Sequence, residues 1–515
     1  GFVLIFFKPI NDTMFDYLRP IFGGKWICFR WIPFIVLSFY LIFSLGYYTT
    51  LFIQDPDFAS TVQTVWKLMI GEFPETTLFY KYYLSNHWMP ILGCIAWVYK
   101  IFPYPWVMLV LSSLSCLFGL IGLRQLAYCI TRSSIFSYVV CLSFVSHPLF
   151  GSAILGRVNT EVYLFSFLVW ALYFGLTRRS FYSFLFIIFS WMCKEDAGLY
   201  TALIGCVLVW VLNDNSKKSM ARYGSFLVCV SLLFFVGING WVMPLYKGIG
   251  TLGNIHWYAH LGDSFTDIIW RCFTHPGLLI RTIFTPDRAY GLFFLSLPIV
   301  GLIFRMGRFL WIPILPITIK LLSSNGDAFS FHKHHFWVPM LFLYVALIVG
   351  AAYLKNRKII SLERISISLT IVSLFFVCLS FSILIPKHVD SFHLFKEGLI
   401  IQKQLDDVKL GYGDSNYRVL GDSQVLAQLA NRRYVYELNP YLKTTYVSYD
   451  DFRLSQIEQA IILERVNYII FDRRKAIERN SNYFLNKLQV IERVKSDMNW
   501  SVLKDSDLLF VARKD

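Results

Sequence analysis

Charged side chains are scarce in this sequence. Only 16% of its 515 residues are Asp, Glu, Lys or Arg, whereas 56% are hydrophobic and 18% are aromatic. Soluble globular domains carry about 25% charged residues. The low charge and a mean hydropathy of +0.52 therefore exclude an ordinary soluble domain and predict a polytopic α-helical membrane protein.

Several common functional motifs are also absent. All ten cysteines lie between Cys28 and Cys378, mostly inside apolar runs, without the spacing of a disulfide framework or a zinc site. We interpret them as small buried hydrophobic residues. Residues 387–515 contain no GxGxxG or P-loop motif, and no inverted repeat of the kind found in many transporters is visible along the chain.

The net charge does not indicate a nucleic-acid partner. The formal charge is +15, but residues 401–515 hold 18 Lys and Arg against 16 Asp and Glu. Nearly all of the basic excess therefore lies in the apolar part of the chain, within short loops. Short loops rich in Lys and Arg are typical of the cytoplasmic side of a membrane protein.

Eleven apolar runs predict membrane-spanning helices, since a span needs about 20 residues. They are residues 31–52, 105–123, 134–155, 162–176, 181–193, 197–212, 223–245, 290–304, 309–323, 336–354 and 365–385. The runs 162–176 and 181–193 are short, and we expect their helices to extend into the flanking polar residues. Segment 87–102 is also apolar, but Pro90 interrupts it.

The basic loops determine how segment 87–102 is interpreted. If this segment does not cross, the most basic connections all lie on one side, the cytoplasm. They carry Lys25, Arg30, Arg124, Arg132, Arg178, Arg179, Lys217, Lys218, Arg222, Arg305, Arg308, Lys355, Arg357 and Lys358. We therefore expect a cytoplasmic N-terminal segment (1–30), a segment 87–102 that lies along or dips into the outer surface, and an extracytoplasmic C-terminus.

With this topology, most of the unusual polar clusters face the outer side. They lie in loop 53–104, loop 246–289 and the shorter outer connections. The clusters are Asp55 and Asp57, Asn86-His87, Arg157-Val158-Asn159-Thr160-Glu161, Lys194-Glu195-Asp196 and His332-Lys333-His334-His335. Acidic residues and histidines barely influence orientation, so charge bias does not impose this coincidence.

After Pro386 the composition becomes that of a soluble domain. The pattern predicts strands at 418–420, 433–438, 500–504 and 508–513, helices at 423–431 and 454–465, and an apolar run at 466–471. Residues 387–515 thus form a small extracytoplasmic α/β domain. We interpret it as a lid or a partner-binding module rather than a second active site.

The outer clusters are suited to sugar transfer from a lipid-linked donor. A carboxylate after the first span, Asp55 or Asp57, can take a proton from an acceptor hydroxyl or hold a metal ion. The leaving lipid phosphate needs cations, which Arg157, Lys194, Lys333 and the histidines offer. Ordinary ion pairs, Arg157 with Glu161 and Lys194 with Glu195 or Asp196, remain the alternative.

A metal site is a further alternative. His332, His334 and His335 suit an irregular loop, and a zinc ion would need more ligands, for example Glu161 or His87. Their spacing does not specify such a site.

Several of these motifs resemble one bacterial family. They are Asp57-Phe58-Ala59, Gln63-Thr64-Val65-Trp66, Gly71, Asn86-His87-Trp88-Met89-Pro90-Ile91-Leu92, Lys194-Glu195-Asp196-Ala197, Val419-Leu420 and Leu429-Ala430-Asn431-Arg432-Arg433-Tyr434-Val435-Tyr436. The chain is similar along most of its length to the predicted membrane proteins catalogued as domain of unknown function 2079. That family is grouped with the GT-C superfamily of glycosyltransferases that use polyprenyl-phosphate sugars.

The resemblance implies a GT-C-like membrane core at 31–386 with an outer-face site and an acidic base in the first outer loop. Asp57 fits that base better than Asp55. Two positions depart from the family pattern. A second acidic position falls on Val62, and an Asp-Phe-His-Pro-Glu-like element reads Arg157-Val158-Asn159-Thr160-Glu161.

The leading hypothesis is an inverting membrane glycosyltransferase at the outer face of the bacterial plasma membrane. It transfers a sugar from a polyprenyl-phosphate donor to a lipid, glycan or protein. The assigned residues are Asp57 and Asp55 as catalytic, Arg157 and Lys194 for the phosphate, Glu161, His87, His334 and His335 for substrate, and His335 with Glu161 for a divalent metal ion if one is used.

Two alternatives stay open. A catalytically degenerate GT-C-like scaffold would bind a protein partner through residues 387–515. A transporter of lipid-linked glycans would carry charged residues buried at mid-helix and paired broken helices. The sequence does not specify the sugar or the acceptor.

Overall fold

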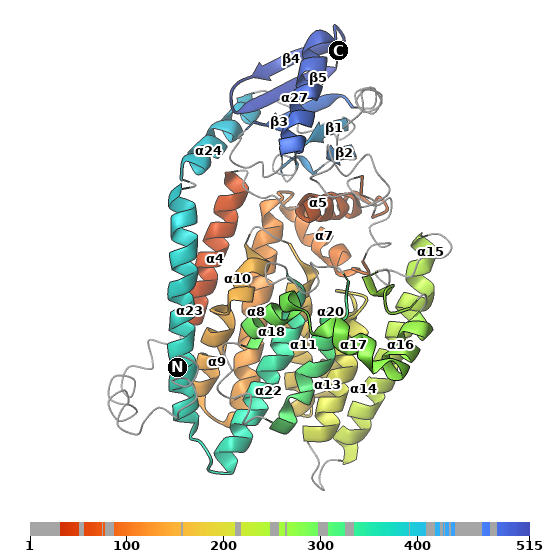
Figure 1. Ribbon diagram of the computed structural model, residues 1–515, viewed down its shortest axis with the longest axis vertical. Helices are drawn as coiled ribbons and strands as arrows, with labels where there is room; N and C mark the ends of the chain where they lie inside the picture. Colours follow the sequence, from red (N-terminus) through yellow and green to blue (C-terminus); the bar gives the residue numbers. More distant parts are fainter. Residues whose placement is uncertain are drawn as a thin grey trace.

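The computed structural model (Figure 1) shows a long helical bundle with a small sheet at one end. The residues described are 31–50, 56–74, 76–77, 87–155, 158–211, 218–247, 257–262, 265–296, 307–324, 334–390, 392–407, 418–422, 426, 428–431, 434–437, 466–473 and 481–514. The N-terminal segment 1–30 lies outside them.

The bundle helices follow the apolar runs of the sequence. They are α4 (Ile32–Thr49), α8 (Trp106–Thr131), α9 (Ser134–Val145), α10 (Pro148–Ile154), α11 (Thr160–Leu176), α12 (Ser180–Trp191), α13 (Ala197–Val211), α14 (Lys218–Gly237), α18 (Pro286–Ser296), α20 (Trp311–Leu321), α22 (Trp337–Asn356) and α23 (Leu362–Asp390). Most of them run roughly along the long axis of the molecule (Figure 1). The predicted class, a mostly helical membrane protein with a small C-terminal sheet, is confirmed.

Within the described residues, three helices are long and apolar enough to cross a membrane. They are Trp106–Thr131, Met220–Leu245 and Trp337–Asn356. The other apolar helices are shorter. Helix α11 extends to the polar residues Thr160 and Glu161, as expected, whereas α12 gains only Ser180 at its start and ends at Trp191, before the polar residues that follow.

One predicted span is two helices. The run 134–155 forms α9 and α10, which are separated at Ser146 and His147. His147 adopts an extended conformation, and its ring accepts a hydrogen bond from the backbone N–H of Leu149. Pro148 follows at the first position of α10, where a proline is tolerated because that N–H has no helical partner. The apolar composition of the run conceals this break.

The segment after His87 forms a short helix, α7 (Ile91–Ile101). At about 1.5 Å per residue, its 11 residues span roughly 17 Å, well short of the ~30 Å hydrocarbon core. This length agrees with the expectation that segment 87–102 does not cross. Helix α5 (Pro56–Met69) packs against α7 and lies across the end of the bundle beneath the sheet (Figure 1).

Helices α13 and α14 approach each other closely through glycines. A Cβ atom on Gly205 would lie 2.6 Å from the carbonyl oxygen of Gly224, and one on Gly224 would lie 2.7 Å from that of Gly205. Small residues let helix backbones approach closely in a membrane protein. This contact fixes α13, which begins beside the Lys194-Glu195-Asp196 motif.

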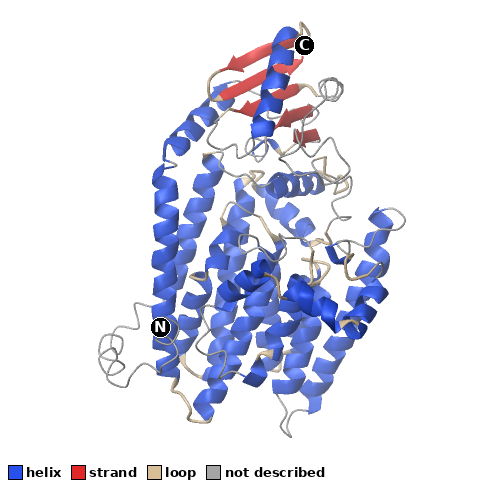
Figure 2. Cartoon of the chain, viewed as in Figure 1, coloured by secondary structure: helices blue, strands red, loops and turns tan. Residues whose placement is uncertain are grey.

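The connection 246–289 contains short helices around a part that lies outside the described residues. The other elements before the sheet are η2 (Ile238–Val242), α15 (Met243–Lys247), α16 (Phe265–Thr274), α17 (Pro276–Ile283), η5 (Gly307–Phe309), η6 (His334–Phe336) and α24 (Phe392–Asp407). Figure 2 separates this helical part of the chain from the C-terminal strands.

The C-terminal sheet has five strands in the order β2-β1-β3-β5-β4. They are β1 (Arg418–Gly421), β2 (Tyr434–Glu437), β3 (Tyr468–Asp472), β4 (Trp500–Asp505) and β5 (Leu509–Lys514). Strand β1 pairs in parallel with β2 and β3, whereas β5 is antiparallel to β3 and β4.

Strands β1, β2, β4 and β5 lie at the predicted positions, and β3 lies within and just after the apolar run 466–471. The predicted helix 454–465 lies outside the described residues. Helix α27 (Ser481–Ser496) was not predicted.

The sheet domain contacts the bundle through polar side chains. The Tyr99 hydroxyl donates to Asn431 Oδ1 at 2.6 Å, and Asn431 Nδ2 donates to the carbonyl of Pro103 at 2.9 Å. Gln428 Nε2 donates to the carbonyl of Tyr48 at 2.8 Å. The domain is therefore held over the ends of α4 and α7.

Candidate functional site

The first element of the site is a buried ion pair between Lys194 and Glu161. Glu161 lies in the first turn of α11, and Lys194 lies in the turn between α12 and α13. The Lys194 ammonium donates to Glu161 Oε1, and only 7% and 6% of the two side chains are exposed. The sequence analysis expected both residues on the outer face; its alternative to phosphate binding paired Lys194 with Glu195 or Asp196, and the structure pairs Lys194 with Glu161 instead.

The ammonium of Lys194 stays charged despite its burial. Burial lowers its pKa, but the carboxylates of Glu161, Asp196 and Glu195 raise it more, so the pKa of Lys194 lies well above its usual value. The turn therefore provides a permanent cation within a low-dielectric part of the protein.

His335 lies on the other side of Glu161. Its Nδ1 atom is 3.7 Å from Glu161 Oε1, and its ring meets the indole of Trp257 edge-on with centroids 5.9 Å apart. Burial lowers the pKa of His335 to about 4, and the nearby ammonium groups of Lys194 and Lys320 act in the same direction. His335 is thus a neutral imidazole at neutral pH. The side chain of His334 lies outside the described part of the structure.

Glu195 connects this turn to the first outer loop. Its Oε1 atom is 2.9 Å from His87 Nδ1, and its Oε2 atom accepts from the backbone N–H of Trp88 at 3.1 Å. Burial raises the pKa of Glu195, but His87 and then Lys194 lower it further, to a net value of about 2. Glu195 is therefore an ionised carboxylate at neutral pH.

Two more hydrogen bonds fix the same connection. Trp88 Nε1 donates to the carbonyl of Trp191 at 2.9 Å, and the N–H of Ile91 donates to the carbonyl of Met192 at 2.9 Å. The start of α7 is thus held against the end of α12. Residues from the first outer loop and from the α12–α13 turn form one site.

Asp196 completes the motif with a third carboxylate. Its Oδ2 atom accepts from Lys320 Nζ at 3.2 Å and from the Tyr200 hydroxyl at 2.9 Å. Lys320, near the end of α20, is buried. Lys320 was not among the residues predicted for the site, although a lysine near the end of the apolar run 309–323 could have indicated a functional position.

Asn239 supports the turn from α14. Its Nδ2 atom donates to the carbonyl of Glu195 at 3.3 Å and to that of Phe235 at 2.9 Å. Asn239 lies in the π-helical turn η2, and such turns often occur at functional sites. Asn239 was also missed, because a lone polar residue in an apolar run carries no recognisable motif.

Asp57, the proposed base, lies in the first turn of α5, and its side chain is exposed. Helix α5 packs on α7, whose start is bonded to Met192, so Asp57 and Lys194 lie at the same end of the bundle (Figure 1). Asp55 and Arg157 lie outside the described residues.

The basic loops lie at the opposite end. Lys355, in the last turn of α22, donates to the carbonyl of Thr131 at the end of α8 at 2.9 Å. Arg132, Arg357 and Lys358 follow these helix ends directly. The separation of basic loops from the acid, lysine and histidine cluster therefore agrees with the topology expected from charge.

A metal ion bound by His335 and Glu161 stays a prediction. Within the described residues, no three His, Cys, Asp or Glu side chains converge on one point. Glu161 Oε1 is already neutralised by Lys194, and a divalent ion would have to displace that ammonium.

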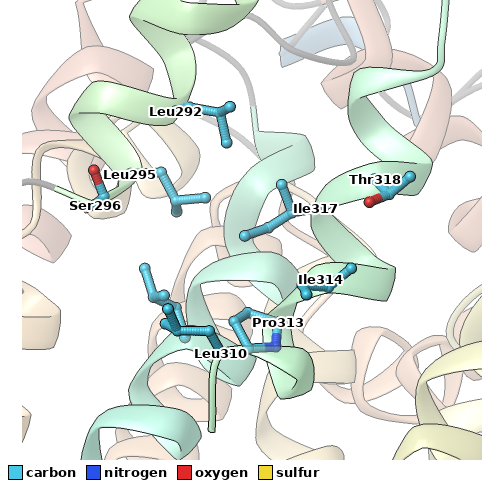
Figure 3. Close-up of a pocket in the computed structure, with 9 residues that line it drawn as sticks. Leu292, Leu295, Ser296, Leu310, Pro313, Ile314, Ile317 and Thr318 are labelled. Carbon is cyan, nitrogen blue, oxygen red and sulfur yellow. The ribbon is translucent and has the colours of Figure 1, made fainter. Parts of the chain in front are cut away.

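An apolar cavity lies beside the part of α20 that precedes Lys320. It has a volume of about 220 Å³ and is formed by α18, α20, α22 and Leu310. Its lining residues are Leu292, Leu295, Ser296, Leu310, Pro313, Ile314, Ile317, Thr318 and Leu343 (Figure 3). None of them is charged, so the cavity suits a hydrocarbon. Its last residue on α20, Thr318, lies two positions before Lys320.

Comparison with known proteins decides the family. The model of a family described as predicted membrane protein (DUF2079) matches residues 47–511. The chain belongs to this family. This DUF2079 protein has no match among curated proteins.

Among solved structures, this DUF2079 protein is similar to ArnT from Cupriavidus metallidurans. For the crystal structure bound to undecaprenyl phosphate, the TM-score is 0.42 and the identity 9%, over 93% of this chain and 97% of that one. For the apo crystal structure, the TM-score is 0.37 and the identity 8%, over 91% and 95%.

Proposed function

We propose that this protein transfers a sugar from a polyprenyl-phosphate donor to a hydroxyl-bearing acceptor at the outer face of a bacterial plasma membrane. The observation that carries the proposal is a pair of buried ammonium groups, Lys194 and Lys320, at one end of the helical bundle. An ammonium has three N–H donors. Within the described residues, each of the two has one bonded acceptor, Glu161 or Asp196.

The spare N–H groups are suited to a phosphate. Charge-assisted hydrogen bonds to phosphate are stronger than neutral ones, and they gain further where water is excluded. Stabilising the departing lipid phosphate lowers the barrier to breaking the bond between the anomeric carbon and the phosphate oxygen. Arg157, outside the described residues, remains a third proposed phosphate ligand.

The apolar cavity supports a lipid donor rather than a soluble one. It lies beside the α20 residues that precede Lys320, and its lining includes leucine and isoleucine side chains. A ligand with an anionic headgroup at Lys194 and Lys320 has an apolar site for its chain along the same helix. A soluble sugar phosphate would make no use of this surface.

Asp57 is the proposed base. Its exposed position at the start of α5 is accessible to an acceptor that arrives from water or from the membrane surface. It would take the proton of the acceptor hydroxyl while that oxygen attacks the anomeric carbon and the lipid phosphate leaves. Glu161 and His335 would orient the substrate around Lys194.

Charge placement argues against transport. In the described residues, the buried charged side chains of the bundle lie at helix ends or in turns: Lys67, Glu161, Lys194, Glu195, Arg288 and Lys320. A transporter of a charged lipid is expected to carry such residues at mid-helix.

The test is binding of undecaprenyl phosphate by the purified full-length protein in lipid nanodiscs, compared with undecaprenol. We expect the phosphate to bind and the alcohol not to bind. Lys320→Met should weaken binding roughly tenfold or more, since it removes a charge-assisted contact. The matched control is Lys355→Met, a lysine at the other end of the bundle. Equal binding of lipid phosphate and alcohol would refute the proposal.

A further inference from the structure

Hydrogen-bond donors and acceptors are segregated along the Lys194-Glu195-Asp196 turn. Lys194 and Lys320 present N–H donors, which recognise phosphate. His87 and Asp196 present atoms that accept hydrogen bonds. An accepting atom does not bind an ionised phosphate oxygen, because both would offer only lone pairs.

Glu195 determines which ring nitrogen of His87 carries a proton and which can accept a hydrogen bond. An ionised carboxylate has no proton to donate, so the 2.9 Å contact requires His87 Nδ1 to carry the hydrogen. In the neutral ring, Nε2 then carries a free lone pair. Within the described residues, His87 Nε2 has no hydrogen-bond partner, and 21% of the side chain is exposed.

Asp196 provides the second accepting atom. Its Oδ2 atom is bonded to Tyr200 and Lys320. Its Oδ1 atom is buried and has no hydrogen-bond partner among the described residues. A buried carboxylate oxygen without a partner costs free energy unless a ligand or water donates to it.

We propose that His87 is a neutral ring with its single proton on Nδ1, and that His87 Nε2 and Asp196 Oδ1 form a subsite for hydroxyl groups of the sugar or of its acceptor. Glu195 is a positioning residue that fixes the tautomer of His87. The inference rests on the proposed sugar transfer and adds which atoms recognise hydroxyls, beside the lysines that recognise phosphate.

The contacts of Glu195 make Glu195→Gln a specific test of the His87 tautomer. Trp88 N–H donates to one carboxylate oxygen and His87 Nδ1 faces the other. In Glu195→Gln, the amide oxygen must stay opposite Trp88 N–H, so the NH₂ group faces His87 Nδ1. That nitrogen must then accept, and the ring proton moves to Nε2. The variant therefore reverses the hydrogen-bonding role of Nε2 with almost no change in shape.

Asp196→Asn acts in the same way on the second atom. The amide oxygen can keep its bonds to Tyr200 and Lys320, and the NH₂ group replaces the accepting Oδ1 atom. Trp88→Phe is the matched structural control. It removes the bond to the Trp191 carbonyl, which joins the same two segments, but leaves the His87–Glu195 contact in place.

The binding test compares undecaprenyl phosphate with undecaprenyl phosphate glucose in nanodiscs. His87→Phe, Glu195→Gln and Asp196→Asn should each weaken binding of the glycosylated lipid roughly fivefold to tenfold, the effect of about one net hydrogen bond. Binding of the bare lipid phosphate should not change, and Trp88→Phe should bind both like wild type. If glycolipid binding is unchanged but the acceptor KM rises by the same factor, the recognised hydroxyl belongs to the acceptor.

Equal weakening of the bare and glycosylated lipids would overturn the inference, because it would make these residues phosphate ligands. So would a loss in Trp88→Phe that matches the others. A second readout is independent of any substrate: ¹⁵N NMR of histidine-labelled protein, with His87→Phe identifying the signal. A protonated Nδ1 in wild type and a protonated Nε2 in Glu195→Gln are expected, and a protonated Nε2 in wild type would refute the assignment. Failure of wild type to bind either lipid would instead refute the proposed function.

Discussion

Lys194 and Glu161 lie 33 residues apart in the sequence and form a buried ion pair at the start of α11. The pair joins two helices at the end of the bundle where Glu195, Asp196, His335 and Lys320 also meet. Breaking a buried pair leaves an uncompensated charge, whereas replacing both partners does not.

Glu161→Gln should therefore lower the free energy of unfolding by about 3–5 kcal/mol, because Lys194 would lose its buried counter-ion. The double variant Glu161→Leu with Lys194→Met should recover most of this loss, since it removes both charges. Thermal unfolding of the purified protein in detergent measures both. A double variant less stable than the single one would show that the pair does not act as a unit.

Asp57→Asn should abolish sugar transfer and change the free energy of unfolding by less than about 1 kcal/mol. The side chain is exposed, and exposed substitutions at a helix start have small effects on stability. Release of polyprenyl phosphate from a glycosylated donor measures transfer. Asp287→Asn, an exposed carboxylate in the first turn of α18, is the control. Transfer by Asp57→Asn at the wild-type rate would exclude Asp57 as the base.

Because the pKa of His335 is low in the folded protein, we expect the free energy of unfolding to decrease as the pH is lowered. The folded state holds His335 neutral down to about pH 4, whereas an unfolded histidine takes up a proton near pH 6.5. Between these values the unfolded state binds more protons than the folded state. The free energy of unfolding therefore decreases as the pH falls, by at most about 1.4 kcal/mol per pH unit.

The measurement is the melting temperature of wild type and His335→Phe between pH 7.5 and 4.5. Glu195, with a folded pKa of about 2, is present in both proteins, so its contribution cancels in the comparison. The facing groups Glu161, Lys194 and Lys320 are unchanged in the variant. We expect a flatter profile for His335→Phe. Parallel profiles would mean that the pKa of His335 does not change on folding.

The sheet domain should dock less stably on the helical bundle when its hydrogen bonds to Tyr99 and Pro103 are removed. Asn431→Ala deletes the bonds to Tyr99 and Pro103, at a cost of about 1–3 kcal/mol in docking free energy for two hydrogen bonds. Limited proteolysis between α23 and the sheet measures the change. Asn499→Ala, which removes a bond to Asp497 within the sheet domain, is the control. Equal cleavage of both variants and wild type would show that Asn431 does not hold the domain.

The sequence determined most of the apolar helices, the separation of basic loops from acid and histidine clusters, and four of the five C-terminal strands. Each of these features is a local pattern, because hydrophobic runs and alternation depend only on neighbouring residues. The sequence also identified Lys194, Glu161, His87 and His335. Each belongs to a polar cluster that interrupts an apolar sequence, where a polar group is costly without a function.

Only the tertiary structure decided which of these residues are partners. Lys194 pairs with Glu161 rather than with its neighbours Glu195 and Asp196, which bond to His87 and Lys320 instead. Successive side chains in a turn point in different directions, so three adjacent charges face three different elements. Lys320 and Asn239 had no motif of their own. They belong to the site because α20 and α14 end beside the turn, and helix packing fixes this arrangement.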